Sequence, residues 1–115
     1  MTADDFEALT NRKLEQCRSV LCSKAKEYAT EDRLHNFKTA AALQGVSPRQ
    51  ALAGMMAKHT VSVYDMCMSD EDYSGAMWDE KITDSINYLL LLNALVQELV
   101  QEEASDRIRD AAALH

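Results

Sequence analysis

The stretch WDEKITDSINYLLLL, Trp78 to Leu92, decides how this chain folds. It begins with acidic residues, passes an amide and ends in four consecutive leucines. On a helical wheel at about 100° per residue, Glu80, Asp84 and Asn87 share one side. The opposite arc is apolar and is the predicted core stripe of a long amphipathic helix: Trp78, Ile82, Leu89, Val96 and Val100.

The polar side of this helix does not stay polar, because Leu91 and Ala94 continue the line of Glu80, Asp84 and Asn87. We therefore expect a partner helix over this second face, from the same chain or from another copy. Partly desolvated carboxylates four residues apart repel each other unless a cation lies between them. The line thus predicts a Mg²⁺ site or, more simply, a solvated face whose acids pair with local basic groups.

Length and composition indicate one helical domain. The chain has 115 residues, of which 47% are hydrophobic, with three glycines and one proline. Helix-forming residues are plentiful and strand formers are not clustered, so we predict an all-α fold. The expected architecture is a compact, MazG-like bundle of about four helices over residues 1–103, followed by a short C-terminal helix or tail over residues 104–115.

The first two helices have recognisable ends. Thr2 with Asp5 resembles a capping box that opens a first helix reaching about Tyr28. Asp32 is a candidate N-cap for a short second helix. Gly45 is well placed to end that helix as its C-cap.

The third helix has the clearest start in the chain. Ser47 is the expected N-cap, Pro48 the first helical residue and Gln50 the second half of a capping box. An acidic, turn-rich loop follows this helix. The fourth helix is then expected to run from near Ala76 to about Glu103 without a breaker.

Charge and cysteine content exclude several classes of protein. The formal net charge of -7 gives no basic face for gripping nucleic acid nonspecifically. The three cysteines show no zinc-binding spacing and favour reduced thiols in a cytoplasm. No apolar run is long enough to span a bilayer, and the acidic N-terminus lacks the features of a signal peptide.

Two polar clusters are candidates to complete a site with the fourth helix. One lies in the break KEYATEDRLHNF and contains Glu27, Arg33 and Asn36; the other contains Lys58 and His59. A polar loop and a packed core histidine are the simpler interpretations. The sequence has no Gly-rich phosphate loop and no GxSxG motif, so any chemistry here would be metal-assisted attack of water on a phosphoryl group.

Three segments in this order carry a family resemblance: EYATEDRLHNFKTAA, GMMAKHTVSVYDM and WDEKITDSINYLLLLNAL. They resemble phage and prophage proteins with a nucleotide-modification-associated domain, which are similar in turn to the MazG-like, all-α nucleoside triphosphate pyrophosphohydrolases. That group holds Mg²⁺ with acids from neighbouring helices and works as dimers or tetramers. The resemblance implies metal-facing Glu27, Glu80 and Asp84, and it implies a set of residues near the ligand: Arg33, Asn36, Lys58, His59, Ser62, Lys81 and Asn87.

Three functions follow as hypotheses. The first is a Mg²⁺-dependent nucleotide phosphohydrolase, or an accessory to nucleotide metabolism, in which Arg33 and Lys58 neutralise phosphate charge and His59 or a carboxylate such as Glu80 orients water. The second is a binding protein that sequesters an intact, cyclic or modified nucleotide in phage anti-defence. The third is a helical interaction protein without a small ligand. The expected setting is the cytoplasm of an infected or lysogenic bacterium, with a homo-dimer or homo-tetramer formed through the fourth helix.

Overall fold

The described part of the chain consists of four helices. The computed structural model describes residues 1–27 and 32–113, with the backbone alone described for residues 24–27. The helices are α1 (Ala3–Glu27), α2 (His35–Gln44), α3 (Pro48–Met68) and α4 (Gly75–Ala113). No strand occurs within these ranges, so the predicted all-α fold of four helices is confirmed. Tyr28, the expected end of the first helix, and residues 114–115 lie outside the described residues.

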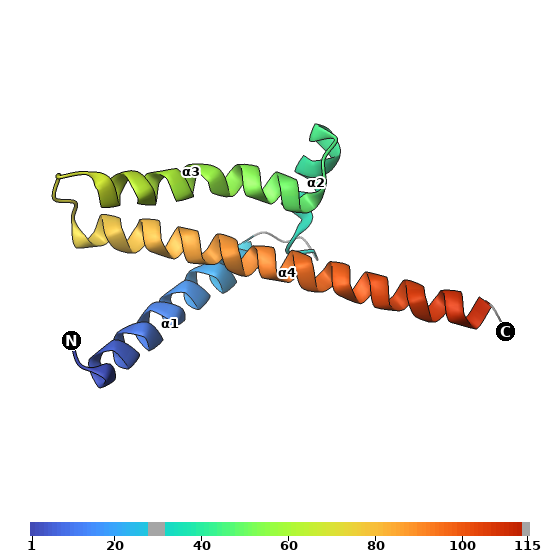
Figure 1. Cartoon of the computed structure of the whole chain (residues 1–115), viewed down its shortest axis with the longest axis horizontal. Coiled ribbons are helices and arrows are strands. Elements are labelled where there is room, and N and C mark those ends of the chain that lie inside the picture. The colour runs from blue at the N-terminus through green and yellow to red at the C-terminus, as the bar shows by residue number, and fades with distance from the viewer. Residues whose placement is uncertain (28–31, 114–115) are drawn as a thin grey trace.

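The helices are arranged around α4 (Figure 1). α3 runs antiparallel beside the first half of α4, α2 closes one end of this pair, and α1 meets the middle of α4 at a steep angle. The C-terminal part of α4 extends beyond the other helices. The radius of gyration is 18.4 Å and the extents are 64 × 36 × 29 Å, against a radius of about 13 Å for a closely packed domain of this length. Among the described residues, a large part of α4 is therefore without a neighbouring helix.

Local capping interactions fix the starts of α1 and α3. Ser47 Oγ accepts a hydrogen bond from the Gln50 N–H at 3.2 Å, and Gln50 Oε1 accepts one from the Ser47 N–H at 2.9 Å. Pro48 is the first residue of α3, as expected. At α1, Thr2 Oγ1 accepts from the Asp5 N–H at 3.1 Å. Each bond satisfies a backbone donor that the helix itself leaves free.

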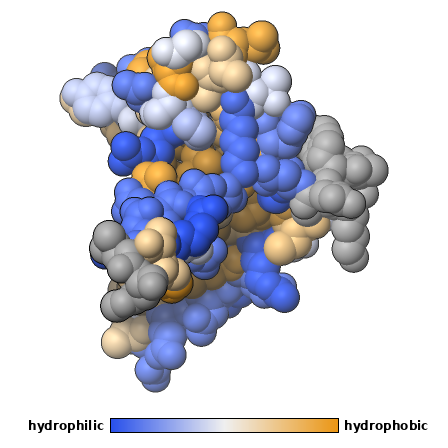
Figure 2. Space-filling view, turned by 90° about the vertical axis from the view of Figure 1, so that its right-hand side faces the viewer, coloured by the Kyte–Doolittle hydropathy of each residue, from blue (hydrophilic) through white to orange (hydrophobic). Residues whose placement is uncertain are grey.

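α2 begins slightly later than predicted. Asp32 Oδ1 accepts from the Leu34 N–H at 3.0 Å and fixes the turn before the helix, while Leu34 occupies the N-cap position. Gly45 ends α2 with a φ of 68°, as predicted for a left-handed C-cap. Leu43, near the end of α2, is 84% exposed. Figure 2, seen from the C-terminal end of α4, shows hydrophobic surface at the top, where α2 lies.

α4 is longer than predicted. It runs without a break from Gly75 to Ala113, so the expected end near Glu103 and the separate element from residue 104 are wrong. Residues 104–113 contain neither Gly nor Pro and are rich in alanine, which favours continuation of the helix. Asp106 and Arg109 form an ion pair three residues apart that supports this last part.

The core joins α2, α3 and α4. Leu34, Phe37, Leu52 and Leu95 are buried together, and five partly buried side chains pack against them: Met55, Met56, Tyr88, Leu91 and Leu92. Full burial of each large apolar side chain contributes roughly 1.5–3 kcal/mol. α1 adds the buried Cys17, whereas its apolar residues nearer the N-terminus are exposed: Phe6, Leu9 and Leu14.

The predicted core stripe of α4 is wrong. Ile82, Leu89, Val96 and Val100 are between 36% and 56% exposed, while Thr83, Asn87 and Leu95 are buried; Trp78 is half-buried. α1 and α3 both pack on the side of α4 that carries Asp84, Asn87 and Leu91. A helical wheel ranks faces by hydrophobicity, but it does not say which face the other helices of the same chain will cover. Among the described residues, no helix is both long and apolar enough to cross a membrane.

An ion-pair network ties the start of α2 to α4. Lys38 Nζ lies 2.7 Å from Asp32 Oδ2 and 2.6 Å from Glu98 Oε1. The hydrogen bonds to Asp32 and Glu98 raise the pKa of Lys38 to about 12. The hydrogen bond from Lys38, with a second from the Leu34 backbone, lowers the pKa of Asp32 below 3.8. The network thus stabilises the fold while all three groups are charged.

Replacing Lys38 tests this network. We expect Lys38→Met to lower the free energy of unfolding by roughly 0.5–1 kcal/mol near neutral pH, because partly exposed ion pairs contribute little. The raised pKa of Lys38 means that its contribution is complete below pH 10.5 and is lost as the pH rises towards 12. The lowered pKa of Asp32 means that its contribution is complete above pH 3.8 and is lost as the pH falls through the lowered value.

Urea unfolding followed by circular dichroism at pH 2, 7 and 9 measures these differences. Arg12→Met, at an exposed position of α1, is the matched control and should change stability by less than about 0.5 kcal/mol. A Lys38→Met deficit that is as large at pH 2 as at pH 7 would contradict the assignment.

Candidate functional site

A recess lies where the end of α1 meets the middle of α4. Its volume is about 110 Å³. Two apolar residues come from α1 and one basic residue comes from the segment before α2; the other lining residues belong to α4: Val20, Leu21, Arg33, Asp84, Asn87, Tyr88 and Leu91. The recess therefore brings Arg33, from the segment before α2, to the polar line of α4.

The polar line of α4 is covered by the chain itself. Asp84 and Leu91 are half-buried and Asn87 is buried, with Val20 and Leu21 of α1 lining the same recess. Glu80 and Ala94, the two ends of the line, are exposed. Of the two expected sources of a partner helix, the same chain supplies it at this face.

Arg33 brings positive charge to the recess. Its side chain is half-buried, and its Nε is buried without a hydrogen-bond partner among the described residues. A guanidinium presents a planar set of donors that suits carboxylate and phosphate oxygens. A buried donor without a partner costs free energy, so an acceptor from a ligand would find a ready contact here.

His59 connects α3 to this side of α4. Its Nδ1 lies 3.8 Å from Asp84 Oδ2, which is an ion-pair distance when the imidazole is protonated but too long for a hydrogen bond. The imidazole lies against the ring of Tyr88, with a centroid distance of 4.9 Å and an interplanar angle of 35°. His59 is thus both packed and polar, combining the two interpretations that the sequence left open.

Asn87 is the most unusual group in the recess. It is 7% exposed, and its Oδ1 is buried with no hydrogen-bond partner in the described part of the chain. Thr83 Oγ1 and Ser85 Oγ on the same helix share this condition. Buried polar atoms are nearly always paired, so three such atoms within five residues mark this part of α4 as built for something other than stability.

The remaining predicted ligand residues lie outside the recess. Asn36 on α2 and Lys58 on α3 are exposed, whereas Ser62 and Lys81 are half-buried. None of these four lines the recess. The structure thus brings together Arg33, Asp84 and Asn87, with His59 beside Asp84.

The carboxylates expected to hold Mg²⁺ are only partly described. Glu80 is exposed and Asp84 is half-buried on α4, while the side chain of Glu27 lies outside the described residues. Across the described side chains, no group of three or more His, Cys, Asp or Glu residues is arranged to hold a metal ion. Two carboxylates of one helix do not by themselves make a dedicated magnesium site, so a metal here depends on Glu27 or on the ligand's own oxygens.

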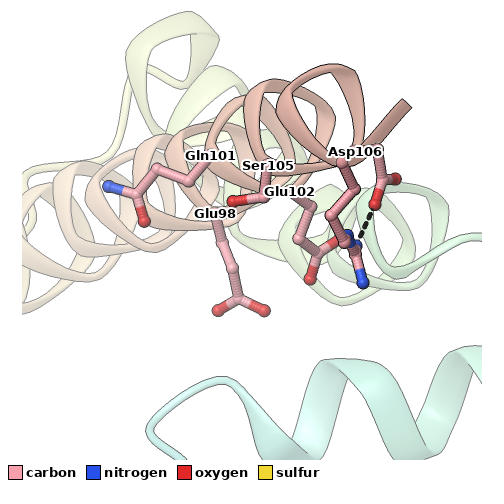
Figure 3. A pocket seen from close by; sticks show the side chains of 6 residues that line it. Glu98, Gln101, Glu102, Ser105 and Asp106 are labelled. Carbon is pink, nitrogen blue, oxygen red and sulfur yellow. Dashed lines mark hydrogen bonds and ion pairs between the residues drawn. The ribbon is translucent and has the colours of Figure 1, made fainter. Parts of the chain in front are cut away.

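Larger hollows lie elsewhere among the described residues, and two of them involve α4. One of about 410 Å³ is lined by six side chains of α4 alone, including Glu98, Glu102 and the paired Asp106 and Arg109 (Figure 3). Because a single helix lines it, it is an open surface. The other, of about 380 Å³, lies between α2, α3 and α4 beside Lys38, whose charge is already paired with two carboxylates. Neither hollow contains a predicted site residue.

Comparison with known proteins leaves the family open. No family model, no curated protein and no solved structure matches the chain. The resemblance to MazG-like phage proteins therefore stays a prediction, and the site is defined by its residues alone.

Several residues of the recess were not among the predicted ligands. Tyr88 belongs to the last sequence motif but was not assigned a role, and Val20, Leu21 and Leu91 complete the wall. Asp84, Tyr88 and Leu91 are spaced i, i+4 and i+7, so the wheel places them on one face. For Val20 and Leu21 the sequence carries no signal, because their position depends on the angle between α1 and α4.

Replacing Asn87 separates stability from function. We expect Asn87→Leu, which replaces the amide with an apolar side chain of the same branching and heavy-atom number, to leave the free energy of unfolding unchanged or raised. Leu95→Ala, at a buried apolar position of the same helix, is the contrasting variant and should lose about 2–5 kcal/mol. Urea unfolding measures both. A loss above about 1.5 kcal/mol for Asn87→Leu would mean that the native amide has a stabilising partner.

Proposed function

We propose that this protein binds a nucleotide at the recess between α1 and α4. The observation that carries the proposal is the convergence of Arg33, Asp84 and Asn87 on one small recess, with His59 of α3 beside Asp84. Protein cores do not gather such groups for stability, because each buried polar atom without a partner costs free energy. A ligand that supplies both an anion and hydrogen-bonding groups would satisfy them.

The size of the recess limits which part of the ligand enters. Its volume of about 110 Å³ equals that of roughly four water molecules, whereas pockets for whole small molecules measure about 300–1,000 Å³. One polar group of the nucleotide, a phosphate or one edge of the base, would enter beside Arg33 and Asn87. The rest of the ligand would lie outside, where exposed predicted ligands such as Lys58 remain available.

The proposed nucleotide binding takes one of two forms, hydrolysis of the bound nucleotide or capture of the intact molecule. In the first, which the sequence resemblance favours, the protein is a Mg²⁺-dependent phosphohydrolase in which Glu27, Glu80 and Asp84 hold the metal. In the second, the protein holds an intact nucleotide. The 3.8 Å approach of His59 to Asp84 supports the second form, because this carboxylate already has a partner when the imidazole is protonated. A phage-type protein acting in a bacterial cytoplasm is part of the same proposal, as is self-association through α4.

Nucleotide binding is tested with a mixed panel of nucleoside mono-, di- and triphosphates and cyclic nucleotides, with and without Mg²⁺. We expect at least one of them to raise the thermal unfolding midpoint, because a ligand that binds only the folded state stabilises it. Arg33→Gln should weaken that binding about tenfold or more, since a charge-assisted hydrogen bond contributes roughly 1.5–3 kcal/mol. Titration calorimetry with the selected nucleotide measures the loss.

Arg12→Gln is the charge-matched control for this binding test, because Arg12 lies on an exposed part of α1 away from the recess. It should bind like the parent protein. If no nucleotide in the panel raises the thermal unfolding midpoint, the proposal is wrong and the helical interaction protein is the better hypothesis.

Mass spectrometry of the bound and released species distinguishes hydrolysis from capture. If the protein is the phosphohydrolase, we expect Mg²⁺-dependent product release and a loss of about 100-fold or more in turnover for Glu80→Gln, because a metal ligand contributes several kcal/mol to the transition state. Turnover that is unchanged in Glu80→Gln would rule out the metal assignment. Recovery of the intact nucleotide, bound equally without Mg²⁺, would establish capture.

A further inference from the structure

An apolar stripe follows the outer side of α4, opposite the recess. Its members are spaced by four, three, four, three and four residues along the helix: Ile82, Ile86, Leu89, Asn93, Val96 and Val100. This is the heptad pattern of a coiled-coil seam, in which one long helix packs against another. We refer to these six residues as the outer seam.

Most of the outer seam is uncovered by the described residues, although Ile86 is half-buried. Ile82 is 37% exposed, Leu89 is 56% exposed and Val100 is 50% exposed; Asn93 is exposed as well. α1 and α3 occupy the other side of α4, and the C-terminal part of α4 extends past both (Figure 1). The most regular apolar pattern of the sequence therefore faces outward.

The exposed area suits a dimer. With the flanking Leu90 and Leu99, which are 41% and 38% exposed, the outer seam presents roughly 400 Å² of apolar surface, a size that on monomers marks an interaction site. Two such surfaces total roughly 800 Å² of apolar area before their polar margins are added, which is close to the total of about 1,000 Å² that a specific interface requires. A second copy matches the seam in length and pattern by definition, as an isologous contact demands.

The residue types in the seam favour a parallel pair. In heptad notation Ile86, Asn93 and Val100 take the a positions, and Ile82, Leu89 and Val96 take the d positions. One polar asparagine at an a position specifies the register and the oligomeric state of a coiled coil, and Asn93 is the one polar residue of the seam. In parallel alignment Asn93 meets Asn93 of the second copy, so the two amides can pair. In antiparallel alignment centred on the seam, Asn93 would face Leu89 instead.

We propose that a second copy of this chain covers the outer seam, with the two α4 helices side by side and parallel, in register at Asn93. The contact lies on the side of α4 away from the recess, so it does not depend on the proposed nucleotide binding. Substitutions at the seam and at the recess are expected to act separately.

Sedimentation velocity over 1–100 µM measures the association. At the higher concentrations, the parent protein should sediment as a dimer with twice the 12.9 kDa mass of one chain. Leu89→Glu should be a folded monomer throughout, because the side chain is more than half exposed in the single chain and the charge would enter only the interface. Leu43→Glu is the matched control: this leucine is 84% exposed on α2, outside the seam, and should leave the dimer intact.

Either of two results overturns the proposal. One is a parent protein that stays monomeric at 100 µM. The other is a dimer that Leu89→Glu leaves as strong as before while its circular dichroism spectrum is unchanged. Both would mean that something other than a second copy covers the seam, or that nothing does.

Disulfide cross-linking tests the orientation. In a chain with Cys17, Cys22 and Cys67 replaced by serine or alanine, Val100→Cys should cross-link to its copy on oxidation, because parallel alignment places the two residues side by side. In the antiparallel pair, the two Val100 positions would lie about 27 Å apart at 1.5 Å per residue. Glu80→Cys, on the other side of α4, is the control and should not cross-link. A dimer without a Val100→Cys cross-link overturns the parallel arrangement.

Discussion

The packing of α1 and α3 against the same side of α4 is the constraint on which the rest of the structure depends. A helix in a small bundle can be covered by its own chain on only part of its circumference, and α4 carries apolar residues over more than that part. The two neighbours pack on the side with Asp84, Asn87 and Leu91. As a result, polar groups are enclosed and a regular apolar stripe is left outside. Both the candidate site and the candidate interface follow from the packing of α1 and α3 on this one side of α4.

The enclosed polar groups work against stability, which is why they indicate function. Thr83, Ser85 and Asn87 bring buried oxygens without partners into the described fold, and each lowers the free energy of unfolding by its desolvation. The core of Leu34, Phe37, Leu52 and Leu95 beside them offsets that cost. Local conflict with folding rules inside an otherwise consistent structure is characteristic of functional sites. Because the buried polar atoms at the recess lack partners, a ligand that supplied those hydrogen bonds would stabilise the fold at this place.

Local features of this fold could be predicted from the sequence, and long-range ones could not. The Ser47, Pro48 and Gln50 start of α3 and the Gly45 end of α2 depend on hydrogen bonds within a few residues, so sequence rules suffice. The buried side of α4 depends on where distant helices pack, and there hydrophobicity indicated the opposite face. For the site, the motif residues Arg33, Asp84 and Asn87 did converge. The apolar wall from α1 had no signal, because it is set by a crossing angle rather than by spacing.

Two asparagines on α4 show how position determines what the same side chain can do. Asn87 lies on the inner side, where α1 encloses its carbonyl oxygen without a partner. Asn93 lies on the outer side in water, where its amide is satisfied at no cost. If a second copy covers the outer seam, Asn93 loses that water, but it gains an identical amide across the two-fold axis. Asn87 has no such symmetry mate, since the surface that covers it belongs to its own chain and presents Val20 and Leu21. No described residue supplies the hydrogen bond that it lacks, so water or a ligand entering the recess can supply it, and this difference separates the roles of the two faces of one helix.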